Sequence, residues 1–290
     1  MMQFTDSHCH LDFTELQHQL PQLLSQCQQS NIRRLIVPSV NPEHWQRVLS
    51  LPAQANHSTV KISCCLGIHP WFIILQDNLP NNKSANSNSA KNIDLIFYEQ
   101  QLKQVVIKHS SEIVAIGECG IDVFKAKKNT ENEQVLSDNL TLQQAFFEMQ
   151  LQIAKDNNLP VIIHHCQSHQ LILPLLKKIK LNRAGVIHAF SGSYQQAKAY
   201  VDLGFKLGIG GTITYARSKK TINAVKRLPL SSLLLETDAP AMPPFGQQGL
   251  INTPLNILTV FNALSTIRDE PAAIIAEQIE SNIEALFFNQ

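Results

Sequence analysis

The chain has 290 residues, of which 44% are hydrophobic and 16% charged, and its formal net charge is +1. This composition is ordinary for a globular enzyme, and the near-neutral charge argues against a broadly basic surface that coats nucleic acid, while leaving room for a local basic patch over a cleft. No apolar run approaches the ~20 residues that cross a bilayer, and the polar first ten residues predict no signal peptide. A cytoplasmic protein without membrane contact is expected.

The cysteines predict reduced thiols and no disulfide framework. They are few, and no pair has the C-x-x-C spacing of redox or metal motifs. Their positions are Cys9, Cys27, Cys64, Cys65, Cys119 and Cys166.

Strand-like and helix-like patterns alternate along the chain. Strands are predicted at residues 3–8, 34–38, 61–66, 113–117, 160–164, 185–188, 206–210 and 233–236. Amphipathic helices are predicted at residues 16–28, 93–109, 140–157 and 194–203, and the tail 254–290 predicts two helices separated around 269–271. Most strands are continuous apolar runs, a pattern typical of parallel strands that are covered on both faces.

Eight strands with intervening helices predict an α/β protein, a (β/α)8 TIM barrel formed by residues 1–290 as a single domain. A doubly wound open sheet is the alternative. Residues with metal-binding side chains stand near five strand ends, and only a closed barrel brings so many strand ends to one mouth. The barrel is therefore favoured, with a metal site at the C-terminal face of the strands.

Two segments are additional to the strands and helices of a minimal (β/α)8 barrel. Residues 76–92 are rich in Asn and Ser and predict a flexible loop without chemistry. Residues 125–139 are polar and charged, and because they follow the fourth strand they are expected to border the mouth.

The candidate metal ligands begin with His8 and His10, which stand two apart and would face the same side of a strand. The other candidates stand at the ends of later strands and are Glu118, His164, His188 and Asp238. Four imidazoles and two carboxylates are more ligands than one tetrahedral site holds. They suit two adjacent cations that keep coordination positions open for water. Asp6 and Glu236 are candidates for supporting the ligands.

Each of these residues also has a structural interpretation. A single His at a strand end is commonly a hydrogen-bonded core residue, and Glu118 or Asp238 could cap a helix. The joint pattern favours metal binding. Glu118 has two oxygens and could bridge two cations, and Asp238 could both bind a metal and accept a proton from water, so these two are the catalytic candidates. The donor set accepts Zn, Mn, Ni or Mg, with Mg least comfortable among nitrogens.

Seven sequence stretches resemble the TatD family of metal-dependent deoxyribonucleases, within the amidohydrolase-type barrels. They are DSHCHLD (6–12), GIHPW (67–71), AIGECGID (115–122), LPVIIHH (159–165), GVIHAFSGS (185–193), GIGGTITY (208–215) and LLLETDAPAMPP (233–244). The resemblance implies a two-metal barrel. It places His8, His10, Glu118 and Asp238 on the first metal, and Glu118, His164 and His188 on the second.

The chain departs from the family pattern at Cys166. The family usually has an Arg two residues after the fifth-strand His, where it would suit a substrate phosphate. His165 or His169 could replace that contact, or the substrate could be a different ester. His165 should point away from His164, because neighbouring strand residues face opposite sides.

Candidate substrate contacts lie on the connections that follow the strands. We expect His69 to bind substrate or to support the metal ligands. The alternative is that it only packs against its neighbours. Arg217, Lys219 and Lys220, together with Lys125, Lys127 and Lys128, form two basic runs near the mouth that either attract a phosphodiester or are solvated loop charges. Trp71, Phe72 and Phe245 are candidates for stacking a base.

The resulting hypothesis is a two-metal hydrolase that uses metal-activated water. The resemblance implies a 3′–5′ exodeoxyribonuclease acting on DNA, single-stranded or at 3′ ends. The alternatives are a metal-dependent hydrolase of carboxyl esters or amides, including aminoacyl-tRNA esters, and a non-catalytic metal-binding protein. No self-association signal is evident, so a monomer without an obligate protein partner is expected.

Overall fold

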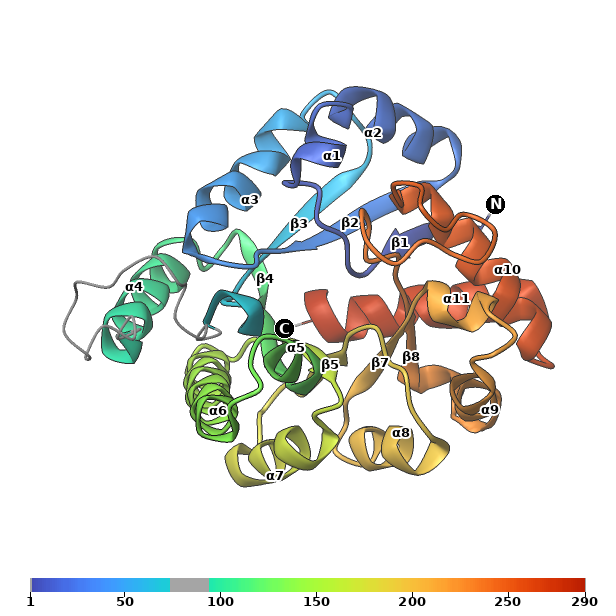
Figure 1. The fold of residues 1–290 in the computed structure, drawn as a ribbon. Coiled ribbons are helices and arrows are strands. Elements are labelled where there is room, and N and C mark those ends of the chain that lie inside the picture. The colour runs from blue at the N-terminus through green and yellow to red at the C-terminus, as the bar shows by residue number, and fades with distance from the viewer. Residues whose placement is uncertain (1, 74–93, 290) are drawn as a thin grey trace.

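The computed structural model describes residues 2–73 and 94–289. Within them, eight parallel strands form one sheet in chain order. Figure 1 shows the strands inside a ring of helices. The strands are β1 (Phe4–Asp6), β2 (Ile32–Pro38), β3 (Lys61–Leu66), β4 (Ile113–Asp122), β5 (Val161–Cys166), β6 (Gly185–Ile187), β7 (Lys206–Ile209) and β8 (Leu233–Leu235). Beyond β1 and β8, the Ser7 amide donates to the Leu235 carbonyl at 3.0 Å and the Asp238 amide to the His8 carbonyl at 2.9 Å. These bonds join the first and last strands, so the predicted (β/α)8 barrel is confirmed.

Helices follow the strands and form the outer layer of the barrel (Figure 1). They are α1 (Thr14–Gln17), α2 (Leu20–Gln29), α3 (Pro42–Gln54), α4 (Leu95–Lys108), α5 (Val123–Lys128), α6 (Glu133–Asp156), α7 (His169–Ile179), α8 (Tyr194–Val201), α9 (Lys219–Arg227), α10 (Ile257–Ile267) and α11 (Ala272–Ile283). Short turns are η1 (Pro70–Ile73), η2 (Gly211–Thr214), η3 (Leu230–Ser232), η4 (Pro254–Asn256) and η5 (Glu284–Phe288).

The strands are buried on both faces, as their continuous apolar runs predict. In β5, the successive residues Val161, Ile162 and Ile163 are all fully buried. Side chains that point inward fill the barrel, and those that point outward pack under the helices. This rigid double packing fixes the positions of the side chains that follow each strand.

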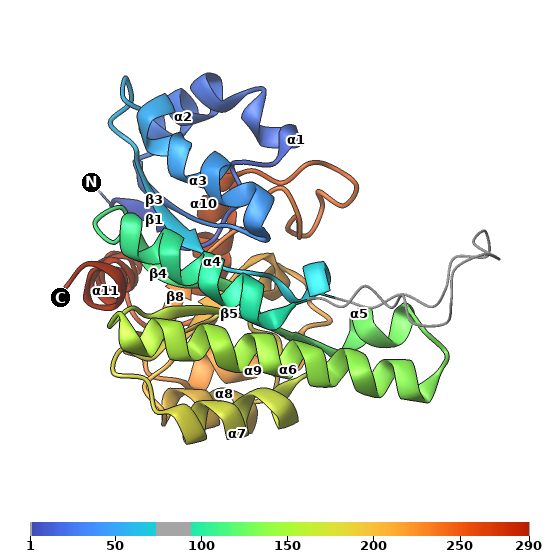
Figure 2. The same cartoon turned by 90° about the vertical axis from the view of Figure 1, so that its left-hand side faces the viewer.

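The two ends of the barrel differ. Helix α11 covers the N-terminal end, where Glu280 accepts hydrogen bonds from the Thr5 amide and hydroxyl, both at 2.7 Å. Arg34 forms an ion pair with Glu284 at 2.6 Å beside it. Figure 2 shows α11 and both termini at one end and α5 at the other. The C-terminal mouth is therefore the end that presents side chains of the strand-to-helix connections.

Several predicted boundaries are wrong. The helix predicted at 16–28 is the two helices α1 and α2, and the fourth strand continues beyond residue 117 to Asp122. Residues 125–139, expected as a polar connection, lie mostly in α5 and in the first turns of α6. Their polar character reflects exposed helix faces. The segment 76–92 lies outside the described residues.

Two expectations from composition can be compared with the structure. All six cysteines are free thiols, as predicted. None of the helices in the described ranges has the length and apolar character needed to cross a membrane. The cytoplasmic location stays a prediction.

Candidate metal centre

The first two predicted ligands converge, although they do not lie on β1. The strand ends at Asp6, and His8 and His10 follow it, on either side of an isolated bridge between Cys9 and Ala239. The bridge continues the strand's alternation, so both imidazoles face inward with their Nε2 atoms 3.1 Å apart. His10 Nδ1 lies 3.2 Å from the Pro38 carbonyl. Because a carbonyl only accepts, this bond places a proton on Nδ1, so the neutral ring has its lone pair on Nε2.

These two nitrogens and two carboxylate oxygens have the spacing of ligands around one cation. Glu118 Oε2 lies 3.4 Å from His8 Nε2 and 3.5 Å from His10 Nε2. Asp238 Oδ1 lies 3.6 Å from His8 Nε2 and 3.5 Å from His10 Nε2. Ligands about 2.0–2.2 Å from a tetrahedral cation are about 3.3–3.6 Å from one another. The donor set therefore fits a divalent metal.

The other oxygen of Glu118 faces a second group of imidazoles. Glu118 Oε1 lies 3.0 Å from His164 Nδ1, 3.4 Å from His69 Nε2 and 3.8 Å from His188 Nε2. Glu118 and His164 were expected at strand ends, but both lie inside their strands. One buried carboxylate thus stands between two sets of nitrogen donors.

Two further carboxylates orient the imidazoles from outside. Asp122 Oδ2 lies 3.1 Å from His164 Nε2, and Glu236 Oε1 lies 2.9 Å from His188 Nδ1. In the neutral ring each carboxylate would hold the proton on the outer nitrogen, which leaves the lone pair of the inner nitrogen for a metal. Glu236 was a predicted supporting residue, but Asp122 was missed. Its spacing from Glu118 could have revealed it, because residues an even number apart on a strand share a face.

Asp6 supports the backbone and not an imidazole ring. It accepts hydrogen bonds from the His8 amide at 3.2 Å, from the Thr237 amide at 2.9 Å and from the Thr237 hydroxyl. Burial raises the pKa of Asp6 to about 8. This residue therefore fixes the segments that follow β1 and β8, from which His8, His10 and Asp238 project.

The ionisable side chains of the cluster are carboxylates and imidazoles, and each kind shifts the pKa of the other. Burial alone would raise the pKa of Glu118 and Asp238, but the surrounding histidines outweigh it and hold both pKa values below the usual range. Burial alone would lower the pKa of His188 and His164, but neighbouring carboxylates raise these pKa values to about 10 and about 9. The cluster thus attracts positive charge, and protons and divalent cations compete for the same nitrogens.

His69 differs from the other imidazoles. Its Nδ1 accepts a hydrogen bond from the Trp71 amide at 3.1 Å, so the proton of the neutral ring lies on Nε2. Burial lowers the pKa of His69 to about 4, which keeps the ring neutral. His69 therefore presents an N–H donor beside Glu118, in keeping with its predicted role in binding substrate.

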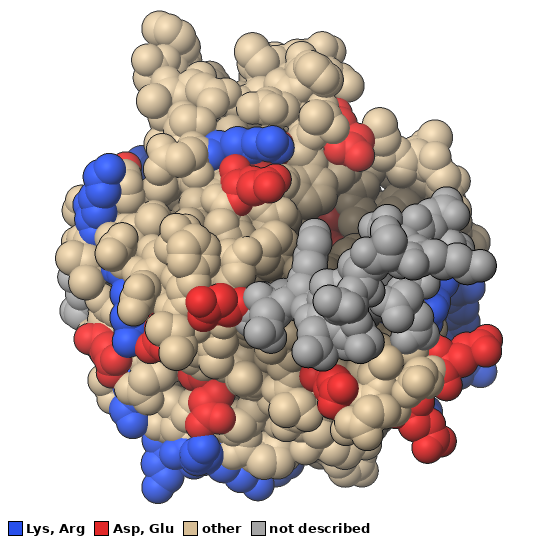
Figure 3. Space-filling model, turned by 60° about the vertical axis from the view of Figure 1, so that its left-hand side comes forward, with Lys and Arg blue, Asp and Glu red and all other residues tan. Residues whose placement is uncertain are grey.

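Arg217, Lys219 and Phe72, three of the predicted substrate contacts, lie further out. Arg217 lies over the Tyr215 ring at 4.8 Å, and Lys219 begins α9; both are exposed, and no contact with the imidazoles is found in the described part of the chain. Phe72 packs on Tyr98 with ring centroids 5.6 Å apart, so it is not a stacking surface at the mouth. On the face shown in Figure 3, basic and acidic side chains are interspersed.

Cys166 ends β5 next to Asp122. Burial and the Asp122 carboxylate raise the pKa of Cys166 to about 11, so the thiol is neutral. It supplies no positive charge where the family usually has Arg. His165 points away from the cluster as predicted, with its ring near those of His169 and Tyr200 at 6.2 and 5.6 Å.

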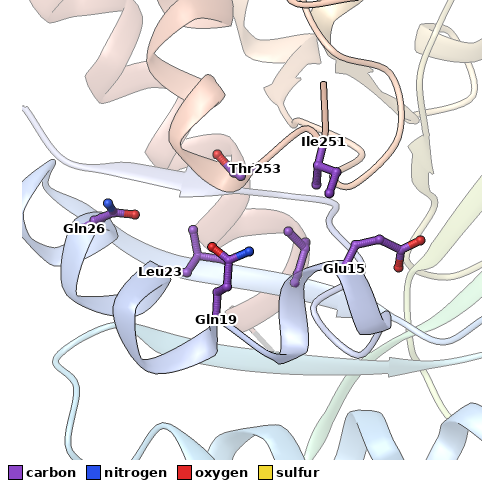
Figure 4. Close-up of a pocket in the computed structure, with 7 residues that line it drawn as sticks. Glu15, Gln19, Leu23, Gln26, Ile251 and Thr253 are labelled. Atoms are coloured by element: carbon purple, nitrogen blue, oxygen red, sulfur yellow. The ribbon is translucent and has the colours of Figure 1, made fainter. Parts of the chain in front are cut away.

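Two surface pockets lie apart from this cluster. A pocket of about 240 Å³ lies between the α1–α2 region and residues 251–253, as Figure 4 shows. Another, of about 430 Å³, lies near the first residues of β2 and β3. Neither is lined by any predicted ligand, so the chemistry-bearing groups lie at the barrel mouth and not in these pockets.

The fold and this cluster define a metal-dependent hydrolase. The family model described as TatD related DNase matches residues 5–288, and the chain belongs to this family. It is 38% identical over 289 residues to an uncharacterized metal-dependent hydrolase of Haemophilus influenzae, covering 99% of this chain and 100% of that one. It is 37% identical over 284 residues to the uncharacterized metal-dependent hydrolase YjjV of Escherichia coli, covering 98% and 97% of the two chains.

Solved structures agree with the family assignment. The crystal structure of YjjV from Escherichia coli matches with a TM-score of 0.82 at 36% identity, over 99% of this chain and 98% of that chain. A TatD family hydrolase from Entamoeba histolytica matches with a TM-score of 0.78 over 100% and 99% of the two chains. At 18% identity this second likeness shows the fold alone.

Proposed function

We propose that this protein is a two-metal phosphodiesterase that removes nucleotides from the 3′ ends of DNA, acting as a monomer on single strands. The observation that carries the proposal is the position of Glu118, whose two oxygens face separate sets of imidazole nitrogens. The family model's description as a DNase supports DNA as the substrate. The 3′ direction follows from the family resemblance.

The proposed ligands divide around Glu118. His8, His10, Glu118 and Asp238 would hold one cation, and Glu118, His164 and His188 the other. When bound, two such cations lower the pKa of a water molecule toward neutrality and offset the charge that develops on a transferred phosphate. Zn, Mn, Ni or Mg could serve, and the nitrogen-rich set favours the first three.

The protein's own side chains would supply proton transfer and orientation. Asp238 is proposed as the proton acceptor because its carboxylate is ionised and its side chain is 14% exposed, against 3% for Glu118. It is thus the more accessible carboxylate of the inner cluster. The Nε2–H of His69 would donate to a substrate oxygen. Arg217 and Lys219 are proposed only to attract the phosphate backbone from further away.

A carboxyl-ester or amide hydrolase, including one acting on aminoacyl-tRNA esters, is the second candidate. The neutral thiol of Cys166 favours it, because a planar carbonyl does not need the positive charge that an Arg offers to a phosphate. A polarised carbonyl and an activated water require the same metal ligands.

Hydrolysis of a substrate panel separates the two candidates. Purified protein loaded with Mn²⁺ should hydrolyse bis(p-nitrophenyl) phosphate and DNA oligonucleotides faster than p-nitrophenyl acetate or an aminoacyl ester. Turnover of the carbonyl esters alone would overturn the phosphodiesterase proposal.

The bridging role of Glu118 is tested by metal content. Glu118→Ala should lose both cations, whereas Glu277→Ala, an exposed position on α11, should retain them. Elemental analysis after gel filtration measures the ratio of metal to protein. A Glu118 variant that keeps two metals per chain would contradict the assignment.

A further inference from the structure

The ring of Trp71 is a rigid exposed surface beside the metal centre. Its side chain is 55% exposed, yet its centroid lies 5.2 Å from that of His69 and 6.3 Å from that of His164. The indole N–H donates to Asp122 Oδ2 at 2.7 Å, and the Trp71 amide donates to His69 Nδ1 at 3.1 Å. Both the side chain and the backbone are therefore fixed to residues of the site.

The ammonium group of a lysine lies close to this ring. Lys125 Nζ lies 4.7 Å from the centroid of the Trp71 ring. Lys125 belongs to α5, and its amide donates to Asp122 Oδ1 at 2.7 Å. Helix α5 and the turn η1, which carries Trp71, are adjacent at the mouth in both ribbon views (Figures 1 and 2).

Asp122 connects these groups to the metal centre. Its Oδ2 contacts both the Trp71 indole and His164 Nε2, while Oδ1 caps the helix that carries Lys125. One buried carboxylate thus holds the Trp71 ring, the backbone of Lys125 and a proposed ligand. A ring fixed in this way loses little conformational freedom when a partner stacks on it.

Resting on the proposed phosphodiesterase function, we infer that Trp71 and Lys125 form the subsite for the terminal nucleotide of an unpaired DNA strand. The exposed indole stacks the base, and the Lys125 ammonium moves from the ring to the adjacent phosphate. This subsite supplies positive charge near the place where Cys166 supplies none. Because a stacked base must be free of its pairing partner, the subsite selects single-stranded ends.

The stacking contact is tested with two 5′-labelled oligo(dT) substrates that differ only at the 3′ end. One ends in thymidine and the other in a tetrahydrofuran unit without a base. Stacking of one base typically changes affinity about 5- to 150-fold, so kcat/KM should favour the thymidine end by at least about fivefold. Trp71→Ala should bring this ratio close to one, and Trp71→Phe should preserve most of it.

The ratio is measured within each variant, so a general loss of folding or turnover cancels. A wild-type ratio near one, or an unchanged ratio in Trp71→Ala, would overturn the stacking role while leaving the phosphodiesterase proposal standing. Absence of cleavage of any diester by the wild type would instead count against the phosphodiesterase.

A fluorescence measurement tests base stacking on Trp71 even if the wild-type protein cleaves no diester. The chain has two tryptophans, and Trp45 is buried, so Trp71 is the main emitter that a ligand can reach in the folded protein. In a Trp45→Phe protein, oligo(dT) should quench Trp71 emission and a fully abasic strand of equal length should not. Equal quenching by both strands, or none by either, would overturn the inference.

The phosphate contact of Lys125 is tested by salt dependence. Lys125→Gln should reduce the slope of log affinity for oligo(dT) against log salt by about 0.7, the value for one phosphate on a single strand. Lys108→Gln, an exposed position at the end of α4, is the control and should leave the slope unchanged. Identical slopes for both variants would remove Lys125 from the subsite.

Discussion

At the scale of single residues, the metal centre depends on which nitrogen of each imidazole carries a proton. The outer partner of each ring decides this: a backbone carbonyl for His10, Asp122 for His164 and Glu236 for His188. His69 has the opposite arrangement, because a backbone amide occupies its acceptor nitrogen. In their neutral forms, three of these rings therefore carry the lone pair on the inner nitrogen, whereas His69 carries an N–H there.

Replacement of Glu236 tests whether the outer partner of His188 sets the position of its proton. Glu236→Gln keeps the shape of the side chain but weakens the charged partner of His188 Nδ1, so metal affinity or turnover should fall about 10- to 100-fold. Metal titration and initial rates measure the change. The control Glu277→Gln, at an exposed site on α11, should resemble the wild type. Wild-type metal affinity and rate in Glu236→Gln would contradict the orienting role.

The residue types of the inner cluster and one outer partner, Glu236, could be predicted from the sequence, but Asp122 was missed. Histidines and carboxylates that follow apolar runs identify the inner cluster. Asp122 could be assigned to His164 only after the actual length of β4 was known. Likewise, Trp71 and Phe72 are neighbours in sequence, yet one is exposed at the mouth and the other packs on Tyr98.

At the scale of secondary-structure elements, close packing between β7 and the segment after β8 positions Glu236. A Cβ atom at Gly208 would lie 2.0 Å from Glu236 Oε2, whereas one at Gly210 would lie 3.6 Å from Glu236 Cγ. Only glycine at position 208 leaves space for the carboxylate that orients His188.

Alanine at these two glycines gives a matched comparison on neighbouring positions. Gly208→Ala should lower the free energy of unfolding by about 1–3 kcal/mol, a typical cost of overpacking, and should weaken metal binding. Gly210→Ala should change both much less. Urea denaturation and metal titration measure the two effects, and equal behaviour of the variants would show that Glu236 does not occupy this space.

The contact between α11 and β1 should give the stability a specific pH dependence. Burial raises the pKa of Glu280, against the lowering effect of its bonds to Thr5. As pH rises, the unfolded chain loses this proton before the folded protein does, so the wild-type free energy of unfolding should decline until pH exceeds the raised pKa. Glu280→Gln should lack this decline.

Urea denaturation across the acidic-to-neutral range measures the difference between the two proteins. The stability of Glu280→Gln relative to the wild type should rise with pH and then level off. Glu277→Gln serves as the control on the same helix. A difference that is constant with pH would contradict a raised pKa at Glu280.

At the scale of the whole molecule, the barrel could be predicted because the sequence pattern that produces it is repeated along the chain. Eight buried apolar runs separated by amphipathic stretches allow few arrangements, and ligands near several strand ends favour closure. Exact boundaries depend on tertiary contacts instead. Glu118 is followed by four more residues of β4 because β5 pairs with β4 as far as Cys166.

The same architecture explains why distant motifs form one site. Residues 8, 118, 164, 188 and 238 lie on five different strands or directly after them. The barrel brings the three histidines within 4 Å of Glu118, and His8 and His188 also within 4 Å of Asp238. The fold therefore supplies the geometry of the cluster, and the proposed subsite at Trp71 and Lys125 lies on the connections around it.

Digestion of a 5′-labelled single-stranded DNA oligonucleotide tests the central proposal most directly. The wild-type protein with Mn²⁺ or Mg²⁺ should produce a ladder that shortens from the 3′ end, and Asp238→Asn should produce none while retaining at least one metal. No cleavage by wild-type protein shown to carry metal, or an undiminished ladder from Asp238→Asn, would contradict the proposed exonuclease or the role of Asp238 as its proton acceptor, respectively.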